Sequence, residues 1–170
     1  MQGFKSFVIG LCKNAPIVLG VSSVIILATV YSMQYLGDFE PCKLCYAQRY
    51  PYFIILVLSL LSFLTHGKIR TIILFLIFLS LLTTISYAIY HVGVEQKWFE
   101  SSCSSSLKIS SSLEDLLAKI DSAPRVPCDE SNLSIIGLSL AAWNAIISTL
   151  LALYTLFCVI RLLVPVNKWS

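Results

Sequence analysis

Residues 71–94 read TIILFLIFLSLLTTISYAIYHVGV, 24 positions without Asp, Glu, Lys or Arg. A helix of about 20 mainly apolar residues is long enough to cross the roughly 30 Å hydrocarbon core of a bilayer. Three further stretches lack these charged residues, at 14–37, 50–67 and 131–160. The sequence therefore predicts an integral membrane protein.

Composition supports this prediction for the whole chain. Of the 170 residues, 57% are hydrophobic and 12% are charged, against about 45–50% and about 25% in ordinary soluble proteins. The mean hydropathy of +0.83 is too high for a soluble enzyme or a disordered chain of this size. No basic run is present that would bind phosphates, so we expect no nucleic-acid partner. We expect a single membrane domain over residues 1–170.

The uncharged stretches predict an all-α fold, an integral membrane four-helix bundle. We place its transmembrane helices near 16–36, 49–65, 71–90 and 138–160. Pro51 is expected in the first turns of the second helix, where proline is tolerated. The first apolar run exceeds the roughly 7–15 residues of a signal-peptide core, and no A-x-A cleavage site follows it, so we interpret it as a membrane helix.

The distribution of charge predicts the orientation of the bundle. The N-terminal arm, the 66–70 turn and the C-terminal tail carry six basic residues and no acid, whereas the other two loops carry all nine acids. Because positively charged loops stay in the cytoplasm, both termini are predicted to be cytoplasmic. The loops at 37–48 and 91–137 are then outside.

The second outer loop has two parts. Eight of the twelve residues in 101–112 are serine, a composition typical of flexible segments. The following residues 113–120 place apolar side chains at i, i+3, i+4 and i+7 with charged residues between them. This spacing predicts a short amphipathic helix on the membrane surface.

Tyrosines gather near the predicted outer ends of the helices. Two interpretations stay open, an interfacial aromatic belt and the lining of a pocket for a flat ring. The residues are Tyr31, Tyr35, Tyr46, Tyr50, Tyr52, Tyr87 and Tyr90.

The six cysteines divide between the two sides of the predicted membrane. Four fall in the outer loops, where disulfides persist: Cys42, Cys45, Cys103 and Cys128. The other two, Cys12 and Cys158, fall toward the cytoplasm, and we expect them to be free thiols that pack as small apolar side chains.

The Cys42-Lys43-Leu44-Cys45 motif suits redox chemistry. A disulfide across two intervening residues closes a small ring, so it stabilises the fold weakly and opens easily. The motif lies where the second helix is predicted to start, and a helix N-terminus favours a thiolate. A structural disulfide and a Cys₄ zinc site with Cys103 and Cys128 are the alternatives.

Arg49 follows Cys45 by one helical turn. Its charge could stabilise a thiolate or a nearby anion, or the side chain could extend to lipid headgroups. The Cys103 and Cys128 pair likewise permits two interpretations. It could form a static bridge, or the serine-rich flank could let Cys103 approach other sulfurs for disulfide exchange.

Several motifs together resemble the disulfide bond formation protein B (DsbB) family. They are PCKLCYAQR at 41–49, YHVGVE at 90–95, PCDE at 127–130 and GLS at 137–139 with Trp143-Asn144. The resemblance covers most of the chain, and the combination is more specific than any one motif. One departure is Gln48, where some members carry glutamate, and this puts an acid-base role at position 48 in doubt.

The resemblance implies a dithiol:quinone oxidoreductase of the bacterial inner membrane. Its expected protein partner is a periplasmic DsbA-like, thioredoxin-fold disulfide oxidase, which it reoxidises, and its expected electron acceptor is membrane quinone, ubiquinone or menaquinone. Carried over by motif, Cys103 and Cys128 form the pair that the reduced partner attacks. Cys42 and Cys45 form the pair beside the quinone, Arg49 holds the quinone or its reduced anion, and His91 also contributes to quinone binding.

Two other functions remain possible at this point. One is a vitamin K epoxide reductase-like enzyme, or a quinone-linked enzyme that runs in the reverse direction. The other is a non-enzymatic membrane scaffold with structural disulfides or a Cys₄ zinc site. If the protein is an enzyme, its natural two-electron acceptor in lipid is a quinone, because no haem, flavin or nucleotide motif is recognisable in the sequence.

Overall fold

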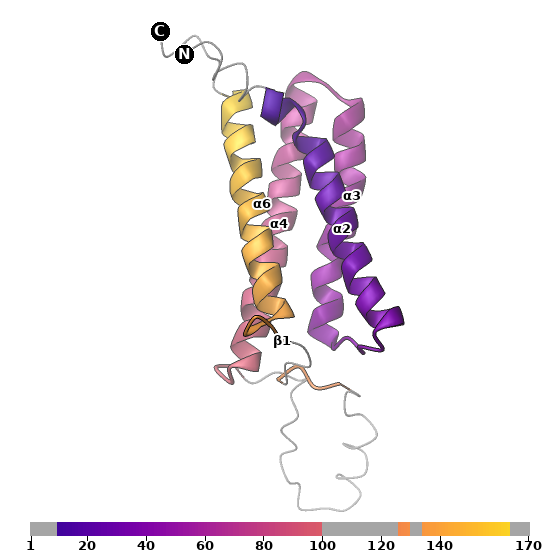
Figure 1. Ribbon diagram of the computed structural model, residues 1–170. Helices are drawn as coiled ribbons and strands as arrows, with labels where there is room; N and C mark the ends of the chain where they lie inside the picture. The colour runs from indigo at the N-terminus through magenta and orange to yellow at the C-terminus, as the bar shows by residue number, and fades with distance from the viewer. Residues whose placement is uncertain (1–9, 100–125, 130–133, 164–170) are drawn as a thin grey trace, which may run out of the picture.

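A computed structural model describes residues 10–99, 126–129 and 134–163. In these residues four long helices form a bundle, and each is long and apolar enough to cross a membrane (Figure 1). They are α2 (Ala15–Leu36), α3 (Lys43–Leu64), α4 (Gly67–Glu95) and α6 (Leu140–Leu163). The predicted all-α membrane bundle is confirmed. The surface helix predicted at 113–120 lies outside the described residues.

The bundle core is built mainly on α4, which packs against both α3 and α6, while α2 packs mainly against α3. Leu74, Ile77 and Leu81 of α4 are fully buried in this core. Large apolar side chains also cover the outside of the bundle, as at Val57 and Leu60, whose exposed fractions are 59% and 65%. An apolar outer surface of this kind is suited to contact with lipid tails.

Helix α3 begins earlier than its charge pattern suggested. We expected the membrane span itself from 49, whereas the helix starts at Lys43, directly after Cys42, where the Cys42–Cys45 motif was expected to open it. The uncharged stretch begins only at residue 50, but a helix can include charged residues near the membrane surface. Pro51 consequently lies in the helix interior rather than in its first turns, which corrects our expectation. The buried Ser80 hydroxyl of α4 donates a hydrogen bond to the Pro51 carbonyl, 3.2 Å away.

The start of α2 and the end of α6 meet at one end of the bundle (Figure 1). Cys12, in a helical turn just before α2, and Cys158 of α6 form a disulfide with Cα atoms 5.1 Å apart. The Tyr154 hydroxyl also donates a hydrogen bond to the Leu11 carbonyl, 2.9 Å away. Our expectation of free thiols at Cys12 and Cys158 is therefore wrong. We inferred free thiols from the compartment alone, and the sequence does not show that two residues 146 positions apart lie side by side.

A small hairpin leads into α6 at the opposite end. Strands β1 (Ser134–Ile135) and β2 (Leu138–Ser139) pair antiparallel around a two-residue turn. Both turn residues, Ile136 and Gly137, have positive φ values of 55° and 77°, as a tight hairpin turn of the primed type requires. The Ser139 hydroxyl then accepts a hydrogen bond from the Ala142 amide, 3.2 Å away, and so caps the N-terminus of α6.

Candidate functional site

A cavity of about 400 Å³ opens near the hairpin end of the bundle and is lined by all four helices. Its volume is within the range of small-molecule sites, about 300–1,000 Å³. Most of its wall is apolar, from residues such as Ile25, Ile26 and Ile147. The polar and reactive side chains on the wall include Cys42, Cys45, Gln48, Arg49, Tyr52, His91, Glu95 and Asn144.

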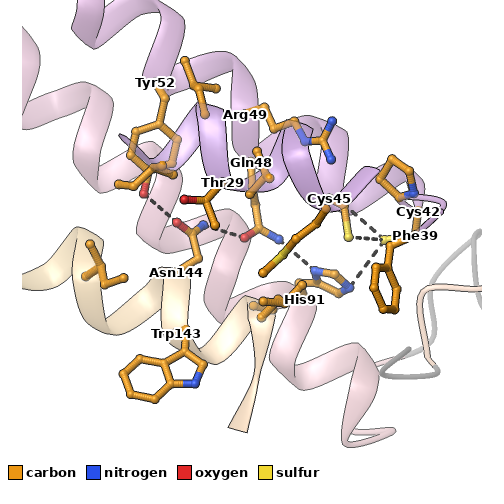
Figure 2. A pocket seen from close by; sticks show the side chains of 18 of the residues that line it. Thr29, Phe39, Cys42, Cys45, Gln48, Arg49, Tyr52, His91, Trp143 and Asn144 are labelled. Carbon is orange, nitrogen blue, oxygen red and sulfur yellow. Dashed lines mark hydrogen bonds between the residues drawn. The ribbon is translucent and has the colours of Figure 1, made fainter. Parts of the chain in front are cut away.

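Cys42 and Cys45 lie at the N-terminus of α3, facing the cavity (Figure 2). Both are free thiols, and their Sγ atoms are 3.0 Å apart. Cys42 is the N-cap residue of α3, and its Sγ accepts a hydrogen bond from the Cys45 amide, 3.3 Å away. This placement brings the partial positive charge of the helix N-terminus to the Cys42 sulfur. The motif therefore holds two thiols close enough to form a disulfide after a small movement.

The surroundings of Cys42 favour its thiolate. The hydrogen bond from the Cys45 side chain, assisted by contact with His91, lowers the Cys42 pKa from 9.0 to about 4, against the opposing effect of burial. The His91 Nε2 atom is 3.6 Å from the Cys42 Sγ. A thiolate is the reactive form of cysteine in disulfide exchange. Cys42 is thus arranged as the reactive sulfur of the pair at neutral pH.

A buried polar chain continues from His91 into the bundle (Figure 2). Gln48 Nε2 is 2.8 Å from His91 Nδ1, and Gln48 Oε1 accepts a hydrogen bond from Asn144 Nδ2 at 2.6 Å. Asn144 Oδ1 in turn accepts a hydrogen bond from the Tyr52 hydroxyl at 2.5 Å. These contacts join α3, α4 and α6 through side chains that the sequence argument did not combine.

Arg49 is a nearly buried cation on the same cavity wall, with 8% of its surface exposed. Its Nη1 donates a hydrogen bond to Gln34 Oε1 at 2.6 Å, and its Cζ lies 4.9 Å from the ring centres of both Tyr31 and Tyr46. In the described part of the chain no carboxylate lies within ion-pair distance of its guanidinium. A cation held by aromatic rings and one amide remains available to an anion.

A second cavity, of about 500 Å³, shares Cys42 and the preceding residues 39–41 with the first. Its wall is more polar and includes Asp38, Glu40 and Lys43. Cys42 lines both cavities, whereas Cys45 lines the apolar one but not the polar one. Cys42 therefore belongs to the walls of both the mainly apolar cavity and the more polar one.

Cys128 lies close to these walls. It is fully buried and packs in one cluster with Cys42 and Val94, and it takes part in a disulfide. Cys103, the other predicted cysteine of the second loop, lies outside the described residues. The structure thus brings Cys42, Cys45, Cys128, Arg49 and His91 together at one end of the bundle.

The metal alternative finds partial geometric support. Ligand atoms of Cys42, Cys45 and His91 all lie within 4.8 Å of one another. A Cys₄ site would also need the Cys128 thiolate, and that sulfur is already in a disulfide. The arrangement therefore supplies a dithiol with an adjacent histidine rather than four thiolates.

The tyrosines do not act as one group. Tyr31 and Tyr46 contact Arg49, and Tyr52 is 2% exposed and hydrogen-bonded to Asn144. Tyr35 and Tyr50, by contrast, are 71% and 68% exposed, as in an interfacial belt. Of the seven tyrosines, Tyr52 lines the apolar cavity, which supports the pocket interpretation at that residue, and the interfacial belt stays a prediction. In the sequence, Gln48 and Asn144 are polar residues next to apolar helix segments. They could have indicated the buried polar groups around Tyr52, because buried intramembrane polar groups usually have a function.

Comparison with known proteins agrees with this geometry. A family model described as "Disulfide bond formation protein DsbB" matches residues 13–158. An uncharacterized protein of Rickettsia prowazekii (strain Madrid E) is 28% identical over 146 residues, which make up 84% of each of the two chains. The matched range includes Cys42, Cys45, Cys103, Cys128, Arg49 and His91.

Proposed function

This chain belongs to the DsbB family of membrane proteins in disulfide-bond formation, and on this premise we propose that it oxidises a DsbA-like protein dithiol and reduces membrane quinone. The membership itself implies an oxidoreductase that acts in disulfide formation. The quinone, the partner and the sites below are our proposal.

One observation carries the proposal, namely that the apolar cavity has a dithiol and a cation in its wall. Cys42, Cys45 and Arg49 all line it. A quinone is a flat apolar ring with two oxygens that gain electrons and protons, and it dissolves in lipid. A mainly apolar cavity with a few convergent polar groups fits such a molecule.

We propose that electrons pass through two disulfides in series. The partner dithiol reduces the Cys103–Cys128 disulfide and itself becomes a disulfide, by exchange of two electrons and two protons. The resulting thiols reduce the Cys42–Cys45 disulfide in the same way. The Cys42–Cys45 dithiol then gives two electrons and two protons to quinone, which leaves as quinol. The packing of Cys128 against Cys42 supports transfer between the two pairs.

The two cavities support a division of roles between the sulfurs. We propose that Cys42 exchanges with the second-loop pair, because it lines the more polar cavity as well as the mainly apolar one. Cys45, which lines the apolar cavity, is then the sulfur nearer to the quinone. Arg49 stabilises negative charge that develops on sulfur and on the quinone oxygen. We assign the polar cavity to the periplasm and both chain termini to the cytoplasm of a bacterial inner membrane, as the charge distribution predicts.

The experiment is quinone reduction by purified protein with a reduced thioredoxin-fold partner. We expect quinol to form only when both are present, with one partner disulfide formed for each quinol. A scaffold would form no quinol, and an enzyme that runs in reverse would consume added quinol and reduce the partner. Either of these results would contradict the proposal.

A further inference from the structure

We propose that Gln48, Asn144 and Tyr52 form a positioning chain that orients His91, so that the His91 Nε2–H group faces the sulfur of Cys42. The proposal rests on the proposed function only in treating Cys42 as a redox sulfur. It assigns a role to three buried polar residues that the electron path itself does not use.

The contacts set the donor and acceptor at each hydrogen bond from Tyr52 through Asn144 and Gln48 to His91. An amide side chain has one acceptor end and one donor end. Because Asn144 Oδ1 accepts from the Tyr52 hydroxyl, Asn144 Nδ2 is the donor to Gln48 Oε1. Gln48 Nε2 is then the donor to His91 Nδ1, 2.8 Å away.

This direction decides which nitrogen of His91 carries the proton. A neutral imidazole has one donor and one acceptor nitrogen, and the partner of one nitrogen sets the state of the other. Nδ1 accepts from Gln48, so the proton is on Nε2. The Nε2–H group can then donate to the Cys42 sulfur, 3.6 Å away.

Because these side chains are buried, water cannot easily replace the hydrogen bond that orients His91. Gln48 and His91 are 6% and 4% exposed, so little water is available to replace a lost partner, and unsatisfied buried polar groups are costly. A glutamine also differs from the glutamate of some family members, since it can donate a hydrogen bond to Nδ1, whereas an ionised carboxylate can only accept one. At position 48 this protein therefore supplies a donor to Nδ1, which leaves Nε2 as the His91 nitrogen that can donate to sulfur.

Other charged or titratable groups also lie near the Cys42 sulfur. The test must separate their effects on Cys42 from the effect of the hydrogen-bond chain formed by Gln48, Asn144 and Tyr52. Glu95 Oε1 is 3.7 Å from His91 Nε2, and Cys45 Sγ is 3.0 Å from Cys42 Sγ. The remaining neighbours are Lys43 and Arg49 on α3, Cys128 from the second loop, and Asp38 and Glu40 before α3.

The test is the pH dependence of iodoacetamide alkylation at Cys42 in reduced, quinone-free protein. Trypsin cleavage at Lys13, Lys43 and Arg49 places Cys42 and Cys45 on separate peptides, 14–43 and 44–49, so mass spectrometry follows each sulfur. We expect Gln48→Ala to raise the alkylation midpoint of Cys42 by about one to two pH units, the value of a hydrogen bond to a charged group. Asn144→Ala should raise it less, and Tyr52→Phe least.

Two controls separate positioning from general disruption. Ser80→Ala removes another buried hydrogen bond between α4 and α3 and leaves Gln48, Asn144 and Tyr52 unaltered. It should leave the alkylation midpoint of Cys42 unchanged. In a His91→Ala background, Gln48→Ala should cause no further shift, because Gln48 acts through His91.

Two results would overturn the proposal. One is an unchanged midpoint in folded Gln48→Ala protein, and the other is an equal shift in the presence and absence of His91. Because the assay contains neither quinone nor partner, its outcome is independent of whether the proposed electron path is correct.

Discussion

The two ends of the bundle each hold a pair of cysteines, and the pairs differ in almost every surrounding feature. At the cavity end, Cys42 and Cys45 are two residues apart in sequence, free, and connected to a polar chain. At the other end, Cys12 and Cys158 join the first and last helices in a disulfide within apolar packing. Cysteine content alone therefore does not identify the redox pair.

The difference lies in what each sulfur touches. The Cys42 Sγ accepts a hydrogen bond from the Cys45 amide at a helix N-terminus and is in hydrogen-bond contact with a second thiol and a histidine, surroundings that stabilise a thiolate. Cys12 and Cys158 are 2% and 0% exposed among apolar side chains, which disfavour a charged sulfur. We therefore expect the first pair to exchange electrons and the second to hold helices together.

The largest expected effect is the loss of either cavity cysteine. Cys42→Ser and Cys45→Ser should each reduce partner-dependent quinol formation to background, because a two-electron transfer from a dithiol needs both sulfurs. Cys45→Ser should also leave Cys42 able to form a lasting disulfide with a second-loop cysteine, detectable by mass spectrometry of non-reduced peptides. Substantial turnover in either variant would remove the distinction between the two pairs.

Removal of the cavity cation should have the next largest effect. We expect Arg49→Ala to lower quinone reduction by about a hundredfold, the usual effect of losing one group that stabilises developing charge. Arg49→Lys should fall between this variant and the wild type, since it keeps the charge and loses the planar fork. Steady-state kinetics with varied quinone measure the effect, and disulfide exchange with the partner provides the control. Unchanged quinone kinetics would indicate that Arg49 only anchors the helix.

At the opposite end, loss of the disulfide should change stability and not turnover. Cys12→Ser should lower the free energy of unfolding by about 2–4 kcal/mol, because the bridge restricts a long loop in the unfolded chain. Cys158→Ser should have the same effect, and the double variant should be no less stable than either. Denaturation in detergent measures this change, with quinone turnover measured in parallel. Inactive but folded Cys12→Ser protein would give this pair a redox role.

The smallest expected effect is at the hydrogen bond beside that disulfide. Tyr154→Phe removes the contact of the Tyr154 hydroxyl with the Leu11 carbonyl, a loss of about 1 kcal/mol. The same denaturation experiment should detect a small decrease in stability and normal turnover. A much larger loss would mean that the hydroxyl holds the end of the bundle more strongly than the disulfide does.

The sequence predicted the helices well because the membrane imposes a strong and local signal, an uncharged run of sufficient length. Predicted helix ends were less accurate where a charged residue lies inside the end of a helix, as Lys43 does in α3 and Lys68 does in α4. The hairpin before α6 was not predicted, since strands of two residues give little periodic signal. Its Ile136-Gly137 turn was the sole local indication.

Local spacing also predicted part of the site, since it placed Cys42, Cys45 and Arg49 at the start of one helix. Local spacing did not predict the contacts between helices. The Gln48–Asn144 hydrogen bond joins residues 96 positions apart, and a list of side chains does not reveal which amides face each other. The Cys12–Cys158 disulfide was missed for the same reason.

The most direct test of the account is a single turnover without partner. Reduced protein in which Cys103 and Cys128 are both replaced by serine, so that no second dithiol can reduce Cys42–Cys45 again, and in which the Cys12–Cys158 disulfide is retained, is mixed with one equivalent of quinone, and each cysteine-containing peptide is then assayed for free thiol. We predict that one quinol forms for each Cys42–Cys45 dithiol lost, while the Cys12–Cys158 pair does not change. Quinol formation with the Cys42 and Cys45 thiols intact, or no quinol formation by folded protein, would contradict the account.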